Sequence, residues 1–379
     1  MDRALQAGLS GLLAGLTSLT IQEVIMLAIG CLLLYLAIGR GLEPLLLLPI
    51  GFGALLVNIP GANLMEPGGV LRVIYDAGVL TELFPVLIFI GIGAMTDFGP
   101  LLENPKILLL GAAGQFGIFL TLFLALMLGF SPLHAISIGV IGAMDGPTAI
   151  YVASKYAPEL LGPISVAAYS YMSLVPLIQP PIMRLLTTKA EKAIVMPAVR
   201  SSVSKPTRIL FPIVVFIVGA IIAPQGTPLL GTVMLGNLMR ESGVVERLTN
   251  MAANELTNIV TLLLGICIGA TMQGDKFLTQ TTLIILGLGF VAICLDTVSG
   301  VLFGKLMCFL THGKVNPLIG AAGISAYPMA ARVVQAEGQR YNRRNYLLMH
   351  AMGANTGGQI GSIIAASIML SVVAGLGIR

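Results

Sequence analysis

A single carboxylate, Asp145, interrupts a long apolar stretch between Ala135 and Val152. Gly146 and Pro147 follow it directly, and both residue types favour an interrupted helix. An ionisable group at membrane depth costs at least about 2.5 kcal/mol, so it is usually retained for a function. Unwound backbone also leaves carbonyl oxygens free, and these suit a bound cation. We therefore predict a cation site at Asp145, although a structural polar contact between helices is the simpler alternative.

The composition predicts an all-α polytopic membrane protein. Of the 379 residues 56% are hydrophobic and 10% are charged, whereas a soluble domain is about 25% charged. The 45 glycines and 21 prolines favour broken or re-entrant helices. We expect ten to twelve segments embedded in the lipid bilayer. The net charge of +4 does not indicate nucleic-acid binding, because the positive residues lie in loops between apolar runs.

Two basic loops predict which side of the membrane is cytoplasmic. Residues 183–208 and 335–345 both carry an excess of Lys and Arg, which is typical of cytoplasmic loops. The resulting division is an interfacial segment at 1–20, a first membrane repeat at 21–190, a basic cytoplasmic linker at 191–208 and a second membrane repeat at 209–379.

The two membrane halves resemble each other. Residues 90–95 align with 266–271, residues 141–144 align with 319–322, and Met172 and Gln179 align with Met352 and Gln359. The loop at 154–163 carries one Lys and one Glu, whereas its counterpart at 335–345 is strongly basic. Equivalent loops with opposite charge bias predict opposite sides of the membrane, and hence an inverted repeat.

Polar residues in the second half complete the predicted site. Asn316, Ser325 and Asn355, with unwound carbonyls and one carboxylate, form a hard-oxygen set that suits Na⁺. Asn316 can instead be a helix cap, and Asn355 a structural contact between helices. Arg332 is either the start of the basic loop or a partner for an anionic substrate and for Asp145.

Other residues leave two interpretations open. Tyr169 and Tyr171 fit an interfacial aromatic belt or a proton relay near a carboxylate. Asp97 is better explained as a turn or cap before Gly99 and Pro100. Asp296, in the middle of an apolar run, is an intramembrane acid that can join a second cation site. The prolines at 176, 180 and 181 predict a break in the helix that contains them.

Several long motifs are similar to those of one family. They are Gly-Ala-Met-Asp-Gly-Pro-Thr-Ala-Ile (142–150), Val-Ala-Ala-Tyr-Ser-Tyr-Met-Ser-Leu-Val-Pro-Leu-Ile-Gln-Pro-Pro (166–181), Asn-Pro-Leu-Ile-Gly-Ala-Ala-Gly-Ile-Ser-Ala (316–326), Gly-Ala-Met-Thr-Asp-Phe-Gly-Pro-Leu (93–101) and His-Ala-Met-Gly-Ala-Asn (350–355). The chain resembles, over nearly its whole length, the β subunit of sodium-pumping biotin-dependent decarboxylases. This family includes the oxaloacetate, methylmalonyl-CoA, glutaconyl-CoA and malonate decarboxylases.

The resemblance implies a function and a set of partners. The β subunit decarboxylates carboxybiotin presented by a biotin carrier subunit, consumes a proton and exports Na⁺. A carboxyltransferase subunit and a small membrane subunit complete the complex in the bacterial inner membrane, where a homo-oligomer is expected. The family fold is an inverted repeat divided into a scaffold and a mobile core that moves like an elevator.

The resemblance also implies roles for individual residues. It places catalysis on Asp145, Tyr171 and Arg332, carboxybiotin binding on Arg332 and Asn316, and Na⁺ binding on Asp145, Asn316, Ser325 and Asn355. Met144 stands where the family usually has Ala, which changes the packing beside the site. Thr356 stands where the family has Val, and its hydroxyl is a possible extra ligand.

A second function from a different class remains open at this point. A Na⁺-coupled secondary transporter of a small organic anion would use the same inverted-repeat site without chemistry. A purely structural membrane anchor leaves the intramembrane acid unexplained. The sequence does not name the acid that a partner subunit would decarboxylate.

Overall fold

The computed structural model describes residues 18–197 and 203–375, and every regular element in these two ranges is a helix. Seven described helices are long and apolar enough to cross a membrane, and α4 and α5 form a further pair bent by 62°. The all-α prediction is confirmed. Complete spans are fewer than the ten to twelve embedded segments that we predicted, because several apolar runs fold as short or broken helices.

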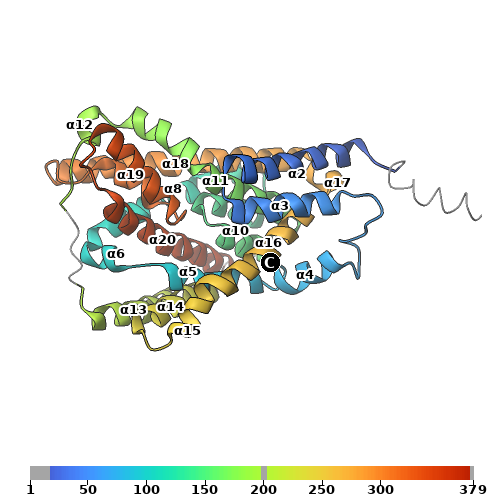
Figure 1. Cartoon of the computed structure of the whole chain (residues 1–379), viewed down its shortest axis with the longest axis horizontal. Helices are drawn as coiled ribbons and strands as arrows, with labels where there is room; N and C mark the ends of the chain where they lie inside the picture. The colour runs from blue at the N-terminus through green and yellow to red at the C-terminus, as the bar shows by residue number, and fades with distance from the viewer. Residues whose placement is uncertain (1–17, 198–202, 376–379) are drawn as a thin grey trace, which may run out of the picture.

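The basic linker divides the helices into two sets along the sequence, which the colours of Figure 1 follow by residue number. The first set is α2 (Ile21–Arg40), α3 (Pro44–Val57), α4 (Val70–Gly78), α5 (Leu83–Met95), α6 (Gly99–Glu103), η1 (Pro105–Ile107), α7 (Leu108–Ala113), α8 (Phe116–Met127), α9 (Pro132–Gly139), η2 (Val140–Ala143), α10 (Gly146–Tyr156), η3 (Pro158–Leu160) and α11 (Leu161–Leu186). After α12 (Lys189–Lys192), the second set is α13 (Lys205–Ile222), η4 (Pro224–Gly226), α14 (Thr227–Ser242), α15 (Glu246–Met251), η5 (Ala252–Leu256), α16 (Thr257–Ala270), α17 (Gly274–Phe277), α18 (Gln280–Leu310), η6 (Pro317–Gly323), α19 (Met329–Tyr341) and α20 (Leu348–Gly375).

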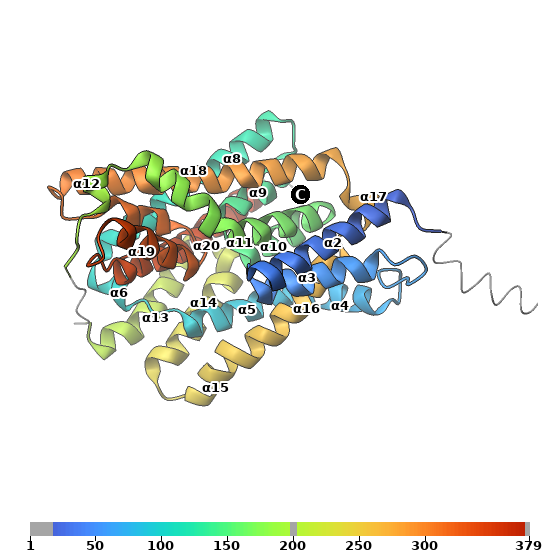
Figure 2. The same ribbon diagram turned by 45° about the horizontal axis from the view of Figure 1, so that its top comes forward.

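Both predicted cytoplasmic loops lie at the same end of the molecule. Figure 1 shows α6, α12 and α19 at one end of the long axis, and α4 and α17 at the opposite end. The first end carries both basic loops, so it is the predicted cytoplasmic end. The turned view in Figure 2 shows α18 running along most of the same axis.

Helices with unwound ends meet in the interior. The first unwound turn lies between η2 and α10, where Met144 adopts a left-handed backbone with a φ of 51°. The second lies between η6 and α19. The main-chain amide of Ser325 donates a hydrogen bond to the carbonyl of Ala143 at 3.3 Å. The two turns, one from each half of the chain, therefore contact each other directly.

Two close helix crossings support these turns. Helix α3 packs along α16, and α14 packs along α5. A side chain at Gly53 would collide with the carbonyl of Ile266, and one at Gly236 with the carbonyl of Ile90. Glycine is needed at both crossings because only the smallest residues let two backbones approach this closely.

The predicted proline break in α11 is wrong. The helix continues from Leu161 to Leu186 through Pro176, Pro180 and Pro181. Proline is tolerated in membrane helices where the neighbourhood satisfies the freed carbonyls. Gln179, directly before Pro180, donates to the carbonyl of Ala321 at 2.7 Å, so this part of α11 packs on η6.

The outer parts of the predicted division fall partly outside the described residues. Of the interfacial segment 1–20, residues 1–17 lie outside them, and Thr20 caps α2 through a capping box with Glu23. The linker is bounded by α12, which ends at Lys192, and by α13, which Ser204 caps. Residues 198–202 within it lie outside the described residues.

Ion pairs fix the predicted cytoplasmic end. Asp97 accepts from the amide of Gly99 at 2.8 Å, which agrees with the predicted turn. It also contacts Arg208 of α13 at 3.0 Å and Arg240 of α14 at 3.7 Å. Arg184 of α11 makes a two-pronged pair with Glu337 of α19, at 2.7 and 2.8 Å. These contacts hold α19 and the end of α5 in place.

The Arg184–Glu337 pair can be tested by substitution. Glu337 is 2% exposed, and its loss leaves Arg184 without its counter-charge. We expect Glu337→Ala to lower the free energy of unfolding by about 1.5–3 kcal/mol, because the carboxylate accepts charge-assisted hydrogen bonds from Arg184. Arg340→Ala is the control, because Arg340 is 63% exposed and its loss should cost less than about 1 kcal/mol. Equal losses in thermal unfolding of the two purified variants would contradict this account.

Candidate functional site

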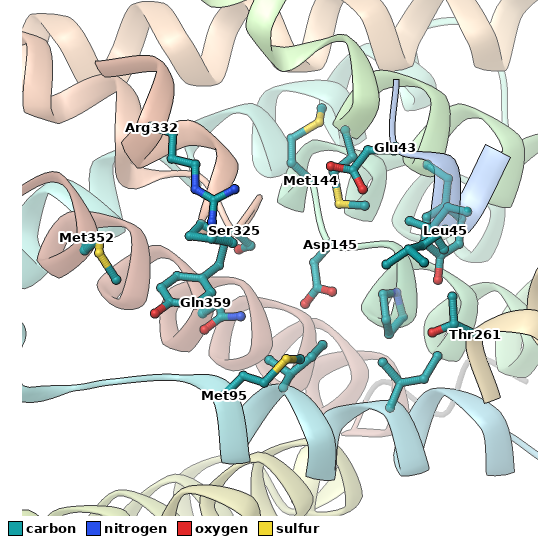
Figure 3. Close-up of a pocket in the computed structure, with 18 of the residues that line it drawn as sticks. Glu43, Leu45, Met95, Met144, Asp145, Thr261, Ser325, Arg332, Met352 and Gln359 are labelled. Carbon is teal, nitrogen blue, oxygen red and sulfur yellow. The ribbon is translucent and has the colours of Figure 1, made fainter. Parts of the chain in front are cut away.

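A cavity of about 650 Å³ lies between the two unwound turns and helices α3, α5, α11, α16 and α20. Three charged residues line it, Glu43, Asp145 and Arg332, and each comes from a different element (Figure 3). Most of the remaining lining is apolar. The cavity therefore brings opposite charges together in a largely apolar surrounding, where electrostatic interactions are stronger than in water.

Asp145 lies at the N-terminal end of α10, immediately after the left-handed Met144. Its side chain is 7% exposed and points into the cavity. One carboxylate oxygen accepts from the hydroxyl of Thr148 at 2.6 Å, which leaves the other oxygen available. The positive end of the α10 dipole lies beside it and interacts favourably with a negative charge, whereas burial opposes ionisation. The placement fits the predicted cation ligand.

Ser325 belongs to the cavity lining, and Asn355 lies outside the lining but contacts the same unwound turn through Ile324. Ser325 lines the cavity, and its hydroxyl lies 2.7 Å from that of Ser362 and 3.0 Å from the carbonyl of Gly358. The Asn355 amide group donates to the carbonyl of Ile324 at 2.5 Å. Its own oxygen is buried and has no hydrogen-bond partner among the described residues. A buried acceptor without a donor is costly, and a cation would satisfy it.

Asn316 and Thr356 do not reach this cavity. Asn316 caps η6 by accepting from the amide of Leu318, and it donates to the carbonyls of Lys192 and Ile194. The cap alternative for Asn316 is therefore confirmed. Thr356 donates to the carbonyl of Gly353 within α20. Roles of these two residues in Na⁺ binding, and of Asn316 in carboxybiotin binding, stay predictions.

The two tyrosines of α11 face different surroundings. Tyr169 lines the cavity and is 2% exposed, and its hydroxyl has no partner among the described residues. Tyr171 points away and donates to the carbonyl of Leu286 on α18 at 2.6 Å. Tyr169, which had been the weaker candidate, thus lines the cavity with Asp145, whereas Tyr171 does not. A proton-transfer role for Tyr171 stays a prediction.

Asp296 forms a separate buried acid. It lies on α18, is 0% exposed, and accepts from the amide of Gly117 at 2.5 Å, near the start of α8. Its second oxygen has no partner among the described residues. It is not part of the cavity lining that contains Asp145. A second cation site at Asp296 stays a prediction.

Three amide side chains hold the unwound segment at the end of η6. Gln179 donates to the carbonyl of Ala321, Gln115 to that of Gly323, and Asn355 to that of Ile324. These carbonyls belong to backbone that has left regular hydrogen bonding, so they need donors from elsewhere. Sequence reasoning missed Gln115, because a neutral side chain in an apolar run gives only a weak signal.

Glu43 was also missed. It lies in the turn between α2 and α3, close to Arg40, so its charge resembles that of an ordinary loop residue. The signal that could have found it is an acid placed directly before Pro44 and a long apolar run.

Broken helices from two halves of a chain, with charges and free oxygens where they meet, are typical of membrane proteins that translocate ions. Comparison with known proteins makes the assignment specific. The chain belongs to the family of Na⁺-transporting oxaloacetate decarboxylase β subunits, which matches residues 22–373. The family resemblance predicted from the motifs is confirmed.

Relatives with three different substrate names are similarly close. The chain is 53% identical over 362 residues to the glutaconyl-CoA decarboxylase β subunit of Acidaminococcus fermentans, with 96% of each chain covered. It is 54% identical over 360 residues to the methylmalonyl-CoA decarboxylase β subunit of Veillonella parvula, with 95% of each covered. It is 48% identical over 431 residues to the oxaloacetate decarboxylase β chain of Klebsiella pneumoniae, with 98% of this chain and 99% of that one covered.

The contrast between the two tyrosines predicts different effects on stability. Tyr171→Phe removes a hydrogen bond to a main-chain carbonyl, so we expect a loss of about 1 kcal/mol in the free energy of unfolding. Tyr169→Phe removes a hydroxyl without a partner among the described residues, so we expect no loss. Thermal unfolding of both variants in detergent measures the difference. A larger loss for Tyr169→Phe would show that the two hydroxyls are placed the other way round.

Proposed function

We propose that this chain decarboxylates carboxybiotin presented by a partner carrier subunit and couples the reaction to Na⁺ export with consumption of a proton. The observation that carries the proposal is the shared cavity of Asp145 and Arg332. Asp145 can hold the exported cation, and Arg332 can hold the substrate carboxylate. Membership in the decarboxylase family favours this function over the Na⁺-coupled anion transporter.

The Na⁺ site in this proposal is centred on Asp145. The free carboxylate oxygen of Asp145, the hydroxyl of Ser325 and the oxygen of Asn355 are hard ligands from two halves of the chain. The hydrogen bond between Ala143 and Ser325 keeps their segments together. This set supports Na⁺ binding where the two unwound turns meet.

Arg332 supplies the anion-binding part. It lies in the first turn of α19 and is directed toward Ser325 (Figure 3). A guanidinium group can pair with the carboxyl group of carboxybiotin in a two-pronged geometry. Decarboxylation then breaks the bond between the biotin nitrogen and the carboxyl carbon. It releases CO₂, and a proton is added to the nitrogen. Tyr169, which lines the cavity together with Tyr327, is a candidate for relaying that proton.

The partners follow from the same proposal. A carboxyltransferase subunit, a biotin carrier subunit and a small membrane subunit complete the complex, in which the β subunit forms a homo-oligomer. The relatives named above differ in the acid that they act on, yet their identities to this chain differ by only a few per cent. We infer that the choice of acid belongs to the carboxyltransferase and not to this membrane subunit.

We further propose an inverted repeat, with α3, α5, α14 and α16 as part of a scaffold and the two unwound turns in a mobile core. The packing of Gly53 on Ile266 and of Gly236 on Ile90 supports it, because Ile90 and Ile266 are equivalent in the sequence repeat. An elevator movement of the core would expose the site to each side in turn. Export requires that decarboxylation change the relative stability of the inward-facing and outward-facing states. If both states bound Na⁺ with equal affinity, Na⁺ binding would not shift the equilibrium between them.

The inverted arrangement predicts opposite sides for equivalent loops. Glu159 and Arg343 are both exposed. In a variant without native cysteines, we expect an impermeant thiol reagent added outside intact cells to label Glu159→Cys. Arg343→Cys should react only after permeabilisation. Labelling of both positions from one side would rule out the inverted repeat.

Reconstitution tests the proposed function itself. The complex of this chain with its carrier and carboxyltransferase should show Na⁺-dependent release of CO₂ and uptake of ²²Na⁺ into inverted vesicles. Carboxybiotin that is not turned over, or turnover that ignores Na⁺, would refute the proposal.

Asp145→Asn is the sharper probe of the site. It removes the charged ligand, so we expect the Na⁺ concentration for half-maximal turnover to rise more than about tenfold, which corresponds to about 1.4 kcal/mol. Asp76→Asn is the matched control, because Asp76 belongs to a surface pair with Arg72 outside the cavity. Asp145→Asn turnover with the parent Na⁺ dependence would remove Asp145 from the mechanism.

A further inference from the structure

Glu43 is the carboxylate of the cavity that the proposed function leaves without a role. It lines the same cavity as Asp145 and Arg332, and its carboxylate is visible beside Met144 (Figure 3). Its φ of 34° is uncommon for a residue other than glycine, and such backbone strain concentrates at functional sites. Although it stands at the start of α3, its side chain makes no cap hydrogen bond. The side chain therefore remains free to face the cavity.

Glu43 and Arg332 influence each other across the cavity. Burial raises the pKa of the Glu43 carboxyl above its usual value, and the charge of Arg332 opposes that shift. Among the described residues, neither the Glu43 carboxylate nor the Arg332 guanidinium forms a hydrogen bond or an ion pair. Each charge thus depends on the contents of the cavity for its compensation.

The charge balance of the cavity then decides what can bind. Two carboxylates and one guanidinium give a formal charge of −1 when all three are ionised. The carboxyl group of carboxybiotin adds a further negative charge. Like charges in a poorly solvated space repel strongly, so the substrate carboxylate is disfavoured until a cation enters. Na⁺ bound at Asp145 neutralises one of the two acids. The charge of Arg332 is then opposed by Glu43 alone, and Arg332 attracts the substrate carboxylate more strongly.

We propose that Glu43 makes carboxybiotin binding depend on Na⁺, because its negative charge, together with that of Asp145, outweighs the charge of Arg332 until Na⁺ has entered the cavity. The inference rests on the proposed function and adds an order to it, with the cation first and the substrate carboxylate second. Linkage makes the effect reciprocal, so bound carboxybiotin also tightens Na⁺ binding. Decarboxylation removes the negative charge of the substrate and thereby lowers the affinity of the cavity for Na⁺.

The test compares the KM for free carboxybiotin at low and at saturating Na⁺, with choline chloride holding the ionic strength constant. In the parent complex we expect the KM to fall about tenfold as Na⁺ is raised. In Glu43→Gln the cavity has one negative charge fewer, so the fall should be less than about threefold. Glu43→Asp keeps the charge and should keep most of the Na⁺ dependence.

Glu82→Gln is the matched control. Glu82 also has a left-handed backbone, with a φ of 62°, and begins α5 without capping it. It lies outside the cavity lining and faces Tyr151 and Lys155, so its variant should keep the tenfold effect. Thermal unfolding is measured first. Glu43→Gln should match the parent there, because the Glu43 carboxylate holds no hydrogen bond among the described residues.

Two results would overturn the inference alone. One is an undiminished Na⁺ effect on the KM in Glu43→Gln, and the other is an equal reduction in Glu82→Gln. Failure of the proposed function looks different, because the parent complex itself would then show no turnover of carboxybiotin or no response to Na⁺.

Discussion

The structure depends on one constraint, which is that unwound main chain within a membrane must satisfy its polar groups without help from water. Two unwound turns lie in the interior, one before α10 and one before α19. Amide side chains from α11, the α7–α8 break and α20 donate in turn to the carbonyls of residues 321, 323 and 324. The surrounding helices are therefore arranged to supply donors to a segment that cannot supply its own.

Much of this arrangement could be predicted from the sequence, because the local signals are strong. An acid followed by Gly and Pro in an apolar run located the turn at Asp145, and the repeat pointed to Ser325 and Arg332. Side-chain direction was harder to predict. Tyr169 and Tyr171 are two residues apart on one helix, and about 200° separates their directions. A motif that contains both cannot tell which one faces the cavity, and the cap formed by Asn316 is likewise a matter of geometry.

The cavity is electrically asymmetric between the two halves of the chain. The first half contributes both acids, Glu43 and Asp145, and the second contributes Arg332 and neutral oxygens. A site built only from neutral oxygens would hold Na⁺ with little sensitivity to an incoming anion. In a site with excess negative charge, the binding of either ligand changes the affinity for the other. This reciprocal effect on affinity is what couples the two ligands.

The contact between Ala143 and Ser325 joins the two turns through main-chain atoms alone. Exchanging the side chain at either position leaves the donor and the acceptor in place, and only proline at position 325 abolishes the donor. A mutagenesis survey that replaces side chains would therefore not detect this main-chain hydrogen bond between the two halves, even if it identified every ligand around it. Evolution is equally free to vary the chemistry on both sides of this link while the meeting point of the halves stays fixed.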